Sequence, residues 1–401
     1  MRTTASFRGR LQVDDSAVGE PISAAIPAVN FGAAADFALG IEEELILVDP
    51  VTHGLEHSAV EVLARLAVPP AEGAALPEAF AALVELTSPV SGDAGEAAAS
   101  LAVLRGHLRS VGATTIGAGL HPNGAFGDVV HYPSERYRMI AKEMRGLMTR
   151  TPTAALHVHV GMPDAEAAIR AYNGLRAHLP LLQALAANSP FWHGLDSGLA
   201  SARAQVFRAL PRSEIPAAFA SFDEYAESVE QLAAAGTLPD YTFLWWDIRL
   251  HPVLGTVEVR SMDSQSSLAD VAGLGALVHA LARRAAEEHG PWEHRDALME
   301  SSFRAARDGL DATLWHDGAL RPVPEIARAT VELALPYARE LGSDAALEEI
   351  ERLLLDGNGA ARRRAAFARG GMIELLAELA EETAQPAGAA VGLGAGVVER
   401  P

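Results

Sequence analysis

Cysteine is absent from the 401-residue sequence, and lysine occurs once, at Lys142. Without cysteine the chain can form no disulfide, no thiolate nucleophile and no thiolate metal site. The single lysine lies in IAKEM without flanking glycines, which excludes a phosphate-binding loop of the G-x-x-x-x-G-K-[ST] type and argues against Schiff-base chemistry. If this protein handles phosphate, it must do so with arginine and metal ions.

Long apolar runs are also missing. No window approaches the roughly 18 uninterrupted apolar residues that a transmembrane helix needs. The N-terminus, MRTTASFRGRLQVDD, has no apolar segment of the kind found in secretory signals, so the sequence predicts a cytoplasmic protein. The formal net charge of −20 argues against nucleic acid or an anionic membrane as the main partner.

The order of strand-like and helical segments predicts an α+β protein. Strands are expected at FALGIEEELILV, FAALVELTSPV, ATTIGAGL, AALHVHVGM, FLWWDIRLHP and GTVEVRSMDS. Helices are expected at GEAAASLAVLRGHLRSVGA and PSERYRMIAKEMRGLM, and one long helix is expected over AEAAIRAYNGLRAHLPLLQALAANS. From about 268 to 382 only helices are expected. Because strands and helices do not alternate regularly, a largely antiparallel sheet is favoured over a doubly wound fold.

Three parts of the chain are distinguished by composition. Residues 1–35 lack periodicity and are predicted to form a partly ordered arm. Residues 36–383 are predicted to form a single domain. Residues 384–401 are rich in glycine and alanine, which indicates a flexible tail.

Charged side chains recur on one face of the predicted strands. Successive side chains of a strand point to opposite faces, so Glu42 and Glu44 of GIEEELILVDP share a face and Glu43 points the other way. Four further strands show the same feature: His157 with His159, Glu258 with Arg260, Asp247 with Arg249 and His251, and Glu85 alone within LVELT.

The residue types on this face point to metal and phosphate chemistry. Carboxylates are the ligands that Mg²⁺ and Mn²⁺ prefer, and Mn²⁺ admits imidazole more readily. Arginines beside them could bind phosphate oxygens. Each group alone has a simpler interpretation as a solvated strand start, a half-exposed histidine pair or an ion pair. Their recurrence in five strands indicates a metal-dependent enzyme without naming its reaction.

The motifs on these strands resemble those of the glutamate–cysteine ligase type 2 family, the carboxylate–amine ligases. They are GIEEELILVDP, LVELTSPV, ALHVHVGMPD, NSPFWHGLDSGLASARAQVF and WWDIRLHPVLGTVEVRSMD. The resemblance runs from about 37 to 265, with a weaker helical continuation to about 382. It implies a single catalytic ligase domain with a glutamine-synthetase-like fold, in which a curved antiparallel sheet carries the active site on its concave face and helices pack behind.

The resemblance also implies ATP-dependent amide formation. ATP would phosphorylate a carboxylate, typically the γ-carboxylate of glutamate, and an amine would then attack the acyl phosphate, with Mg²⁺ or Mn²⁺ neutralising the triphosphate. The implied metal ligands are Glu42, Glu44, Glu85, His157 and Glu258, with Glu85 shared between metals. The implied nucleotide-binding residues are His157, His159, Arg249 and Arg260. The implied catalytic residues are Arg260, Glu85 and Arg203, while Asp247 has a less defined place near them.

Two segments depart from the family pattern. GAGLHPNGAFGDVVHYPSERY keeps His121-Pro122 and Arg136-Tyr137 but differs between them, and Ala202 stands where a larger, often aromatic residue is expected. Because both regions would shape the substrate pocket, glutamate as donor and cysteine as acceptor stay open.

Two other functions remain compatible with the residues. A metal-dependent amidohydrolase could use His157 and His159, but it would need further ligands on alternating βα units of a barrel. A nucleotide- or metabolite-binding protein could keep the ligase fold without turnover. For the ligase, the expected partners are a small-molecule carboxylate such as L-glutamate and an amine or amino acid. A homodimer is implied by the family alone.

Overall fold

The computed structural model describes residues 26, 29–235, 239–288 and 292–385. Most of the predicted arm (1–35) and nearly all of the predicted tail (384–401) lie outside the described residues. The described end of the arm packs on the domain: the backbone N–H of Asn30 donates to the carbonyl of Pro252 (2.9 Å), and that of Gly32 donates to the carbonyl of Met162 (2.8 Å).

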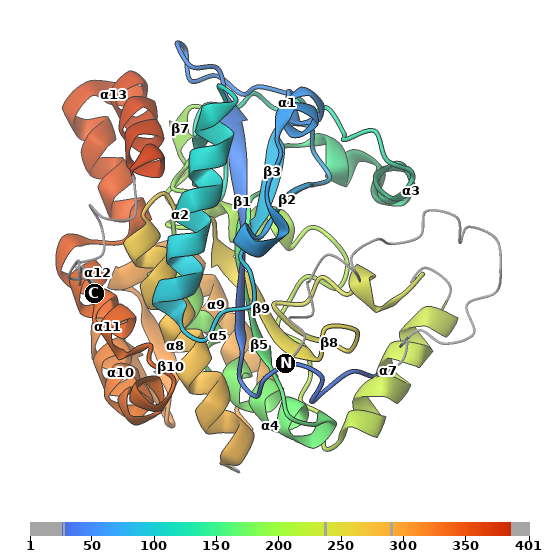
Figure 1. Ribbon diagram of the computed structural model, residues 1–401. Coiled ribbons are helices and arrows are strands. Elements are labelled where there is room, and N and C mark those ends of the chain that lie inside the picture. Colours follow the sequence, from blue (N-terminus) through green and yellow to red (C-terminus); the bar gives the residue numbers. More distant parts are fainter. Residues whose placement is uncertain (1–25, 27–28, 236–238, 289–291, 386–401) are drawn as a thin grey trace, which may run out of the picture.

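In the described part of the chain, a seven-stranded sheet forms the centre of the molecule (Figure 1). Its strands are β1 (Leu39–Val48), β2 (Ala74–Pro77), β3 (Leu83–Thr87), β4 (Thr114–Ile116), β5 (Ala155–Gly161), β8 (Ile248–His251) and β9 (Thr256–Asp263). The order is β2-β3-β1-β5-β9-β8, with β4 pairing with the end of β1. Every pairing is antiparallel, which confirms the predicted α+β class.

The strand register brings charged residues of different strands together. Glu44 lies opposite Glu85 of β3, and Glu42 lies opposite His157 of β5. Farther along, His159 pairs with Glu258 of β9. Directly opposite residues of an antiparallel pair place their side chains on the same face. These residues therefore share one face, which we call the front of the sheet.

Helices cover the other face, the back of the sheet. Ile41, Leu45 and Val158 point to this face and are fully buried. The helices that pack there are α2 (Ala94–Ser110), α4 (Ala165–Arg176), α5 (Leu179–Leu185) and α8 (Leu268–Glu287). Figure 1 shows α2 and α8 lying along the sheet. No helix within the described ranges is both long and apolar enough to cross a bilayer.

The remaining elements lie around this sandwich of sheet and helices. Helices nearer the front or the ends of the sheet are α1 (Ala59–Arg65), α3 (Glu135–Met144), α6 (Ala202–Phe207) and α7 (Phe222–Ala234). The C-terminal helices are α9 (Arg295–Asp308), α10 (Val323–Glu340), α11 (Asp344–Leu347), α12 (Glu349–Asp356) and α13 (Gly359–Ala384). Short 3-10 turns are η2 (Pro70–Glu72), η3 (Arg145–Thr149), η4 (Tyr241–Phe243) and η5 (Gly309–Asp311), and small hairpins are β6 (Phe191–Trp192) with β7 (Leu195–Asp196) and β10 (Thr313–His316) with β11 (Ala319–Pro322).

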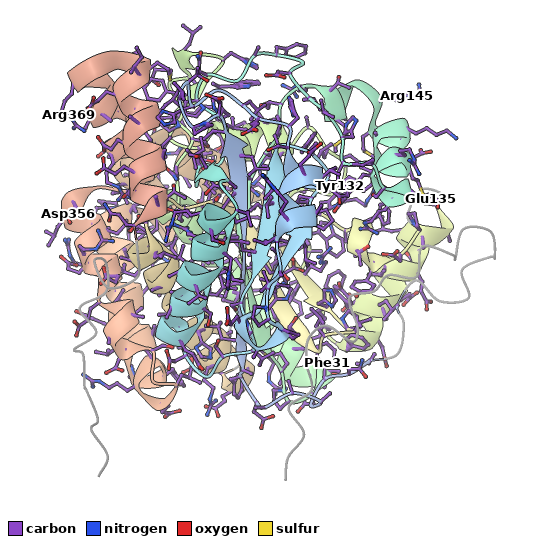
Figure 2. All side chains as sticks on the ribbon, turned by 45° about the horizontal axis from the view of Figure 1, so that its top comes forward. Phe31, Tyr132, Glu135, Arg145, Asp356 and Arg369 are labelled. Atoms are coloured by element: carbon purple, nitrogen blue, oxygen red, sulfur yellow. The ribbon has the colours of Figure 1, made fainter. Side chains whose placement is uncertain are left out.

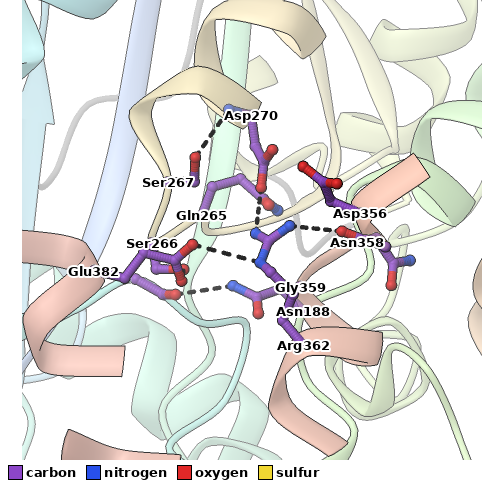
Figure 3. Close-up of polar contacts among 12 residues, drawn as sticks. Asn188, Gln265, Ser266, Ser267, Asp270, Asp356, Asn358, Gly359, Arg362 and Glu382 are labelled. Carbon is purple, nitrogen blue, oxygen red and sulfur yellow. Dashed lines mark hydrogen bonds and ion pairs between the residues drawn. The ribbon is translucent and has the colours of Figure 1, made fainter. Parts of the chain in front are cut away.

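Buried charges hold the C-terminal helices against α8 (Figure 3). Asp270 of α8 pairs with Arg352 of α12 (2.6 Å) and with Arg362 of α13. Near the end of α13, Glu382 accepts a hydrogen bond from the Ser266 hydroxyl (2.6 Å) and lies 3.4 Å from Arg362. The last long helix is thereby joined to the segment that follows β9.

The prediction of one long helix over 165–189 is wrong. The segment forms α4 and α5, with a break at Ala177 and His178. Pro180 explains the break, because proline has no N–H to donate to the preceding turn and disfavours the helical conformation in the residue before it. Proline is tolerated in the first turn, where it lies in α5.

The prediction that only helices follow residue 268 is also wrong, because β10 and β11 form a hairpin. Its turn contains Asp317 and Gly318, with φ of 47° and 75°. Two positive φ angles are typical of a type I′ hairpin turn, for which Asp-Gly is a favoured sequence. The signal was therefore present in LWHDGALRP.

Candidate active site

The five residues predicted as metal ligands converge on the front of the sheet. Within the described residues, ligand atoms of Glu42, His157 and Glu258 lie within 4.8 Å of one another, as do those of Glu44, Glu85 and His157. The residue common to both groups is His157 on β5, whereas the resemblance implied Glu85. Four strands thus contribute to two overlapping groups.

Carboxylates crowd one side of this site. Burial raises the pKa of Glu85 well above its ordinary value, and the neighbouring Glu42, Glu78 and Glu44 raise it further. Burial likewise raises the pKa of Glu44 to about 8, with Glu78 adding to the effect and nearby arginines opposing it. Burial and mutual repulsion together raise these pKa values more than the nearby arginines lower them.

Glu78 is a member of this cluster that sequence reasoning missed. It follows β2 and accepts a hydrogen bond from the backbone N–H of Ala79. Burial raises its pKa, and the negative charge of Glu42 acts in the same direction. Because Glu78 lies in a turn after Pro77, it takes no part in the alternation of a strand. Only its charge directly before the apolar run AFAALV could have drawn attention to it.

The two histidines of β5 approach a single carboxylate oxygen. His157 Nδ1 lies 3.5 Å and His159 Nε2 lies 3.3 Å from Oε2 of Glu42. Neither nitrogen makes a hydrogen bond of good geometry to any described residue. Burial, reinforced by Arg260, lowers the pKa of His157 to about 4, so its imidazole is neutral at pH 7 and can act as a metal ligand.

Glu258 is held by two arginines. Arg249 Nε and Nη2 donate to its two carboxylate oxygens at 2.6 and 3.1 Å, and Arg260 forms an ion pair with it. Burial alone would raise the pKa of Glu258, but Arg249 and Arg260 lower it well below its ordinary value. Arg249 also donates to the carbonyls of Thr242 and Leu244. By contrast, Arg260 Nε is buried without a hydrogen-bond partner among the described residues.

Arg203 approaches the site from α6. Its side chain is 5% exposed, and its guanidinium lies 3.8 Å from Asp263 at the end of β9. Asp263 accepts hydrogen bonds from the hydroxyls of Ser189 (2.7 Å) and Ser201 (2.8 Å). Its ion pair with Arg203 is longer than either of these hydrogen bonds. Arg203 Nε, like Arg260 Nε, has no partner within the described ranges. Two buried guanidinium donors are therefore available beside the carboxylates.

Asp247, in contrast, does not join either ligand group. It directly precedes β8, and its carboxylate pairs with Arg208 of the segment after α6 at 3.1 Å. Its link to the site runs through the backbone, because its carbonyl accepts a hydrogen bond from the N–H of Arg260 (2.8 Å).

α3 and η4 flank the carboxylates. Ser134 caps the N-terminus of α3, with its hydroxyl accepting a hydrogen bond from the backbone N–H of Tyr137. Arg136 stacks over Phe243 (4.5 Å) and donates to the Thr242 hydroxyl (2.9 Å), and the Tyr137 hydroxyl donates to the carbonyl of Pro77 (3.1 Å). Figure 2 shows α3 at the rim of the molecule, with Glu135 and Arg145 labelled there.

The two segments that the sequence predicts to depart from the family pattern contact each other. Ala202 is fully buried in a small cluster with Leu120 and Val206. The backbone N–H of Gly194 donates to the carbonyl of Pro122 (2.9 Å). The small residue at 202 and the altered loop after residue 120 therefore belong to one packing unit beside Arg203.

The residues of the front face fit a hard divalent cation. Carboxylate oxygens and a neutral imidazole are donors that Mg²⁺ and Mn²⁺ accept. Burial and the neighbouring carboxylates raise the pKa values of Glu44 and Glu85, and a bound cation would oppose both effects by stabilising the ionised forms. His157 Nδ1 has no hydrogen-bond partner in the part of the chain that the structure describes.

Comparison with known proteins assigns the chain to a family. Residues 38–379 match the family model of glutamate-cysteine ligase family 2. The chain belongs to this family. A Rubrobacter xylanophilus protein provisionally named glutamate–cysteine ligase 2-3 is 42% identical over 365 residues, covering 88% of this chain and 99% of the relative. The glutamate–cysteine ligase of Halobacterium salinarum is 34% identical over 341 residues, covering 81% and 94%.

Solved structures share the fold at low sequence identity. The Francisella tularensis glutamate–cysteine ligase in complex with AMP superposes with a TM-score of 0.62 at 13% identity, covering 89% of this chain and 94% of that chain. The bifunctional glutathione synthetase of Pasteurella multocida has a TM-score of 0.63 at 16% identity, covering 88% and 52%.

Family membership assigns the class of enzyme. The chain is a glutamate–cysteine-ligase-like, ATP-dependent carboxylate–amine ligase. The amidohydrolase alternative is wrong, because the charged residues lie on an open antiparallel sheet rather than at the end of a βα barrel.

Proposed function

We propose that this ligase joins the γ-carboxylate of L-glutamate to an amine through a glutamyl phosphate formed from ATP. The observation that supports it most is the pair of ligand groups sharing His157, set beside two buried guanidinium donors without partners in the described chain. Carboxylates that gather cations and arginines that bind anions are both needed to handle a triphosphate.

The carboxylates and His157 form the cation-binding part of the proposed site. Glu42, His157 and Glu258 would hold one divalent cation, and Glu44, Glu85 and His157 a second. Bound there, Mg²⁺ or Mn²⁺ would neutralise the triphosphate and stabilise the charge that develops on the transferring phosphoryl group. Glu78 lies close enough to raise the pKa of Glu85, so it adds negative charge that favours cation binding.

The arginines have different tasks in the proposed site. Arg260 would bind the transferring phosphoryl group or the tetrahedral intermediate, because its Nε donor is free while its other side is anchored on Glu258. Arg203 would bind a phosphate or a substrate carboxylate. Arg249 uses its donors on Glu258 and on backbone carbonyls, so we assign it to orienting Glu258.

The proposed reaction has two steps. A γ-carboxylate oxygen of glutamate attacks the γ-phosphorus of ATP, the bond from that phosphorus to the bridging oxygen breaks, and ADP leaves. The amine nitrogen then attacks the carbonyl carbon of the glutamyl phosphate. The carbon–oxygen bond to phosphate breaks, inorganic phosphate leaves, and the nitrogen loses a proton. Activation is required because an unmodified carboxylate is a poor electrophile with a poor leaving group.

The acceptor is the least determined part of the proposal. Relatives are named as glutamate–cysteine ligases, which makes cysteine the first amine to test. The packing unit formed by Ala202 and Leu120 departs from the family pattern beside Arg203, which is a reason to test other amines as well. A homodimer also stays a prediction.

The test is ATP-dependent phosphate release with L-glutamate, Mg²⁺ or Mn²⁺, and a panel of amino acids and amines, with products identified by mass. We expect one acceptor to give a mass equal to glutamate plus amine minus water, and we expect Glu258→Gln to abolish it. ATP binding without phosphate release across the panel would favour a binding protein that keeps the ligase fold. Activity that persists after chelation of all divalent cations would contradict the cation assignment.

A further inference from the structure

Glu43 lies between Glu42 and Glu44 on β1 but points to the back of the sheet. There it meets Arg105 of α2, whose Nε and Nη2 donate to the two carboxylate oxygens at 2.8 and 2.6 Å. The two side chains are 0% and 1% exposed, so the pair is sealed from water. A two-pronged contact of this kind fixes both the position and the plane of a carboxylate.

The rest of the Arg105 guanidinium reaches the backbone of two other segments. Nη1 donates to the carbonyls of Ser266 (2.6 Å) and Thr383 (3.3 Å), and Nη2 donates to the carbonyl of Gln265 (2.9 Å). Together with the bonds to Glu43, these contacts use all five donors of the guanidinium. Arg105 therefore joins β1 to the segment directly after β9 and to the last turn of α13.

This link spans a place where the sheet ladder is irregular. Between β5 and β9 the register shifts, so that Leu156 faces Met262 but Val158 faces Val259. The extra residue of β9 falls next to Arg260. A bulge interrupts the ladder and increases the local twist. Regular pairing between β5 and β9 is therefore missing beside Arg260, where contacts outside the ladder can add to what holds β1 relative to β9.

A second contact supports the same link. The Ser264 hydroxyl donates to the backbone carbonyl of Glu44 at 2.6 Å. β1 is thus tied to the segment after β9 at two successive residues, Glu43 through its side chain and Glu44 through its backbone. The ties lie behind the strand whose front carries Glu42 and Glu44, while Glu258 projects from β9.

We propose that Glu43 and Arg105 form a rear clamp that positions Glu42 and Glu44 of β1 relative to Glu258 of β9. This inference rests on the proposed cation-binding role of those three carboxylates. The rear clamp contacts neither cation nor substrate; it sets the spacing of ligands on strands that are not neighbours. Loss of the clamp weakens cation binding in protein that is still folded.

The experiment measures Mn²⁺ binding to the full chain without nucleotide, from the electron paramagnetic resonance signal of free Mn²⁺. The variants are Arg105→Lys, which keeps the charge but not the five-donor fork, and the double variant Glu43→Leu with Arg105→Met, which leaves no unpaired buried charge. The matched control is Asp270→Asn, because Asp270 is also fully buried and held by two arginines but contacts only helices. Thermal unfolding of each protein is recorded in parallel.

We expect all three changes to lower the unfolding temperature, and only the clamp variants to bind Mn²⁺ about 10- to 100-fold more weakly, the range found when residues that orient metal ligands are removed. Clamp variants with wild-type Mn²⁺ affinity, or a control that loses affinity equally, would show that Arg105 serves stability alone. A wild-type chain that binds no Mn²⁺ would instead remove the cation assignment of the proposed function, and the clamp with it.

Discussion

Glutamates on the two faces of β1 have opposite electrostatic surroundings. On the back, Glu43 receives two hydrogen bonds from Arg105, whose remaining donors are all used on carbonyls. On the front, Glu44 is driven by burial and by Glu78 to a pKa of about 8. The three consecutive glutamates therefore differ. The charge of Glu43 is matched by Arg105, and Glu44 faces other carboxylates. Burial would raise the pKa of Glu42, but His159 and His157 lower it below its ordinary value.

This contrast distinguishes buried charges that stabilise the fold from buried charges that serve the proposed site. Burying a charge without adequate partners costs free energy, and folded proteins keep such arrangements mainly where function needs them. On the back of the sheet and among the helices behind it, the fold itself satisfies the buried ions. Glu43 is paired with Arg105, and Asp270 of α8 with Arg352 and Arg362. The front is left electrically incomplete, in the manner expected of a site that is completed by cations and an anionic substrate.

The largest effect on the difference between the two faces is expected from Glu85→Gln. We expect phosphate release to fall about 10³-fold, the size of effect seen when a group that stabilises transition-state charge is lost. At the same time we expect the metal-free variant to be as stable as the wild type or more stable by about 1 kcal/mol, because a repelled carboxylate is removed. Enzyme kinetics and urea unfolding in EDTA measure the two effects.

The matched change on the back is Glu43→Gln. We expect it to destabilise the protein by about 3–5 kcal/mol, because it leaves Arg105 buried without its counter-ion. If the metal-free Glu85→Gln protein lost as much stability as Glu43→Gln, the front face would be as fully paired as the back and the contrast would fail.

A smaller loss is expected from Arg260→Lys. Lysine keeps the charge but not the planar fork, and Arg260 has a buried Nε donor without a partner among the described residues. We expect kcat to fall about 10²-fold with little change in KM for glutamate, as for a contact made chiefly in the transition state. Arg249→Lys is the comparison, since its donors are spent on Glu258 and carbonyls. A rise in KM alone for Arg260→Lys would place this residue in substrate binding.

Much of this contrast can be read from the sequence, because a strand sends alternate residues to opposite faces. That rule placed Glu42 and Glu44 together and Glu43 apart. It does not say which strands are neighbours, and the meeting of His157 with Glu42 and Glu258 depends on the order β1-β5-β9. The family resemblance implied an antiparallel sheet and a shared ligand set, but the strand order comes from the structure.

Other residues were beyond sequence reasoning for identifiable reasons. Glu78 lies in a turn, where no periodicity assigns a direction to a side chain. Arg105 is 62 residues from Glu43, and nothing in an alanine-rich helix marks one arginine as the partner of a strand. The β10–β11 hairpin is a different case, because its Asp317-Gly318 sequence is typical of a hairpin turn and could have predicted it.

Cation binding should have a smaller effect, which is measured as a gain in stability. We expect Mg²⁺ or Mn²⁺ at about 100 times the dissociation constant to stabilise the wild type by about 2.7 kcal/mol, which amounts to several degrees in Tm. Glu85→Gln should lose this shift. Arg328→Gln should retain it, because Arg328 pairs with Glu351 at 3.0 Å on the exposed surface of the C-terminal helices. A full shift in Glu85→Gln would remove Glu85 from the cation ligands.

The smallest effect expected is a pH dependence of stability in the metal-free protein. Burial raises the pKa of Glu44 from 4.5 to about 8, so its contribution to stability is complete below pH 4.5 and declines as the pH rises towards 8. His157, whose pKa burial lowers to about 4, has the opposite sign but acts below its ordinary value of 6.5. From pH 6.5 to 8 the free energy of unfolding should therefore fall, by at most about 1.4 kcal/mol per pH unit for one group.

The last of the C-terminal helices, α13, supplies the control for this pH effect. Burial would raise the pKa of Glu382, but Arg363 and Arg362 lower it below the ordinary 4.5, so its contribution is lost only in acid and is constant from pH 6.5 to 8. Urea unfolding in EDTA across that window should show a slope that Glu44→Gln makes shallower and Glu382→Gln preserves. Some slope should remain in Glu44→Gln, because the pKa values of Glu85 and Glu78 are also raised. Saturating Mg²⁺ should also make the wild-type slope shallower, because a bound cation keeps Glu44 ionised at every pH of the window. A slope unchanged in Glu44→Gln would mean that Glu44 does not titrate in this window, contrary to its burial beside Glu78.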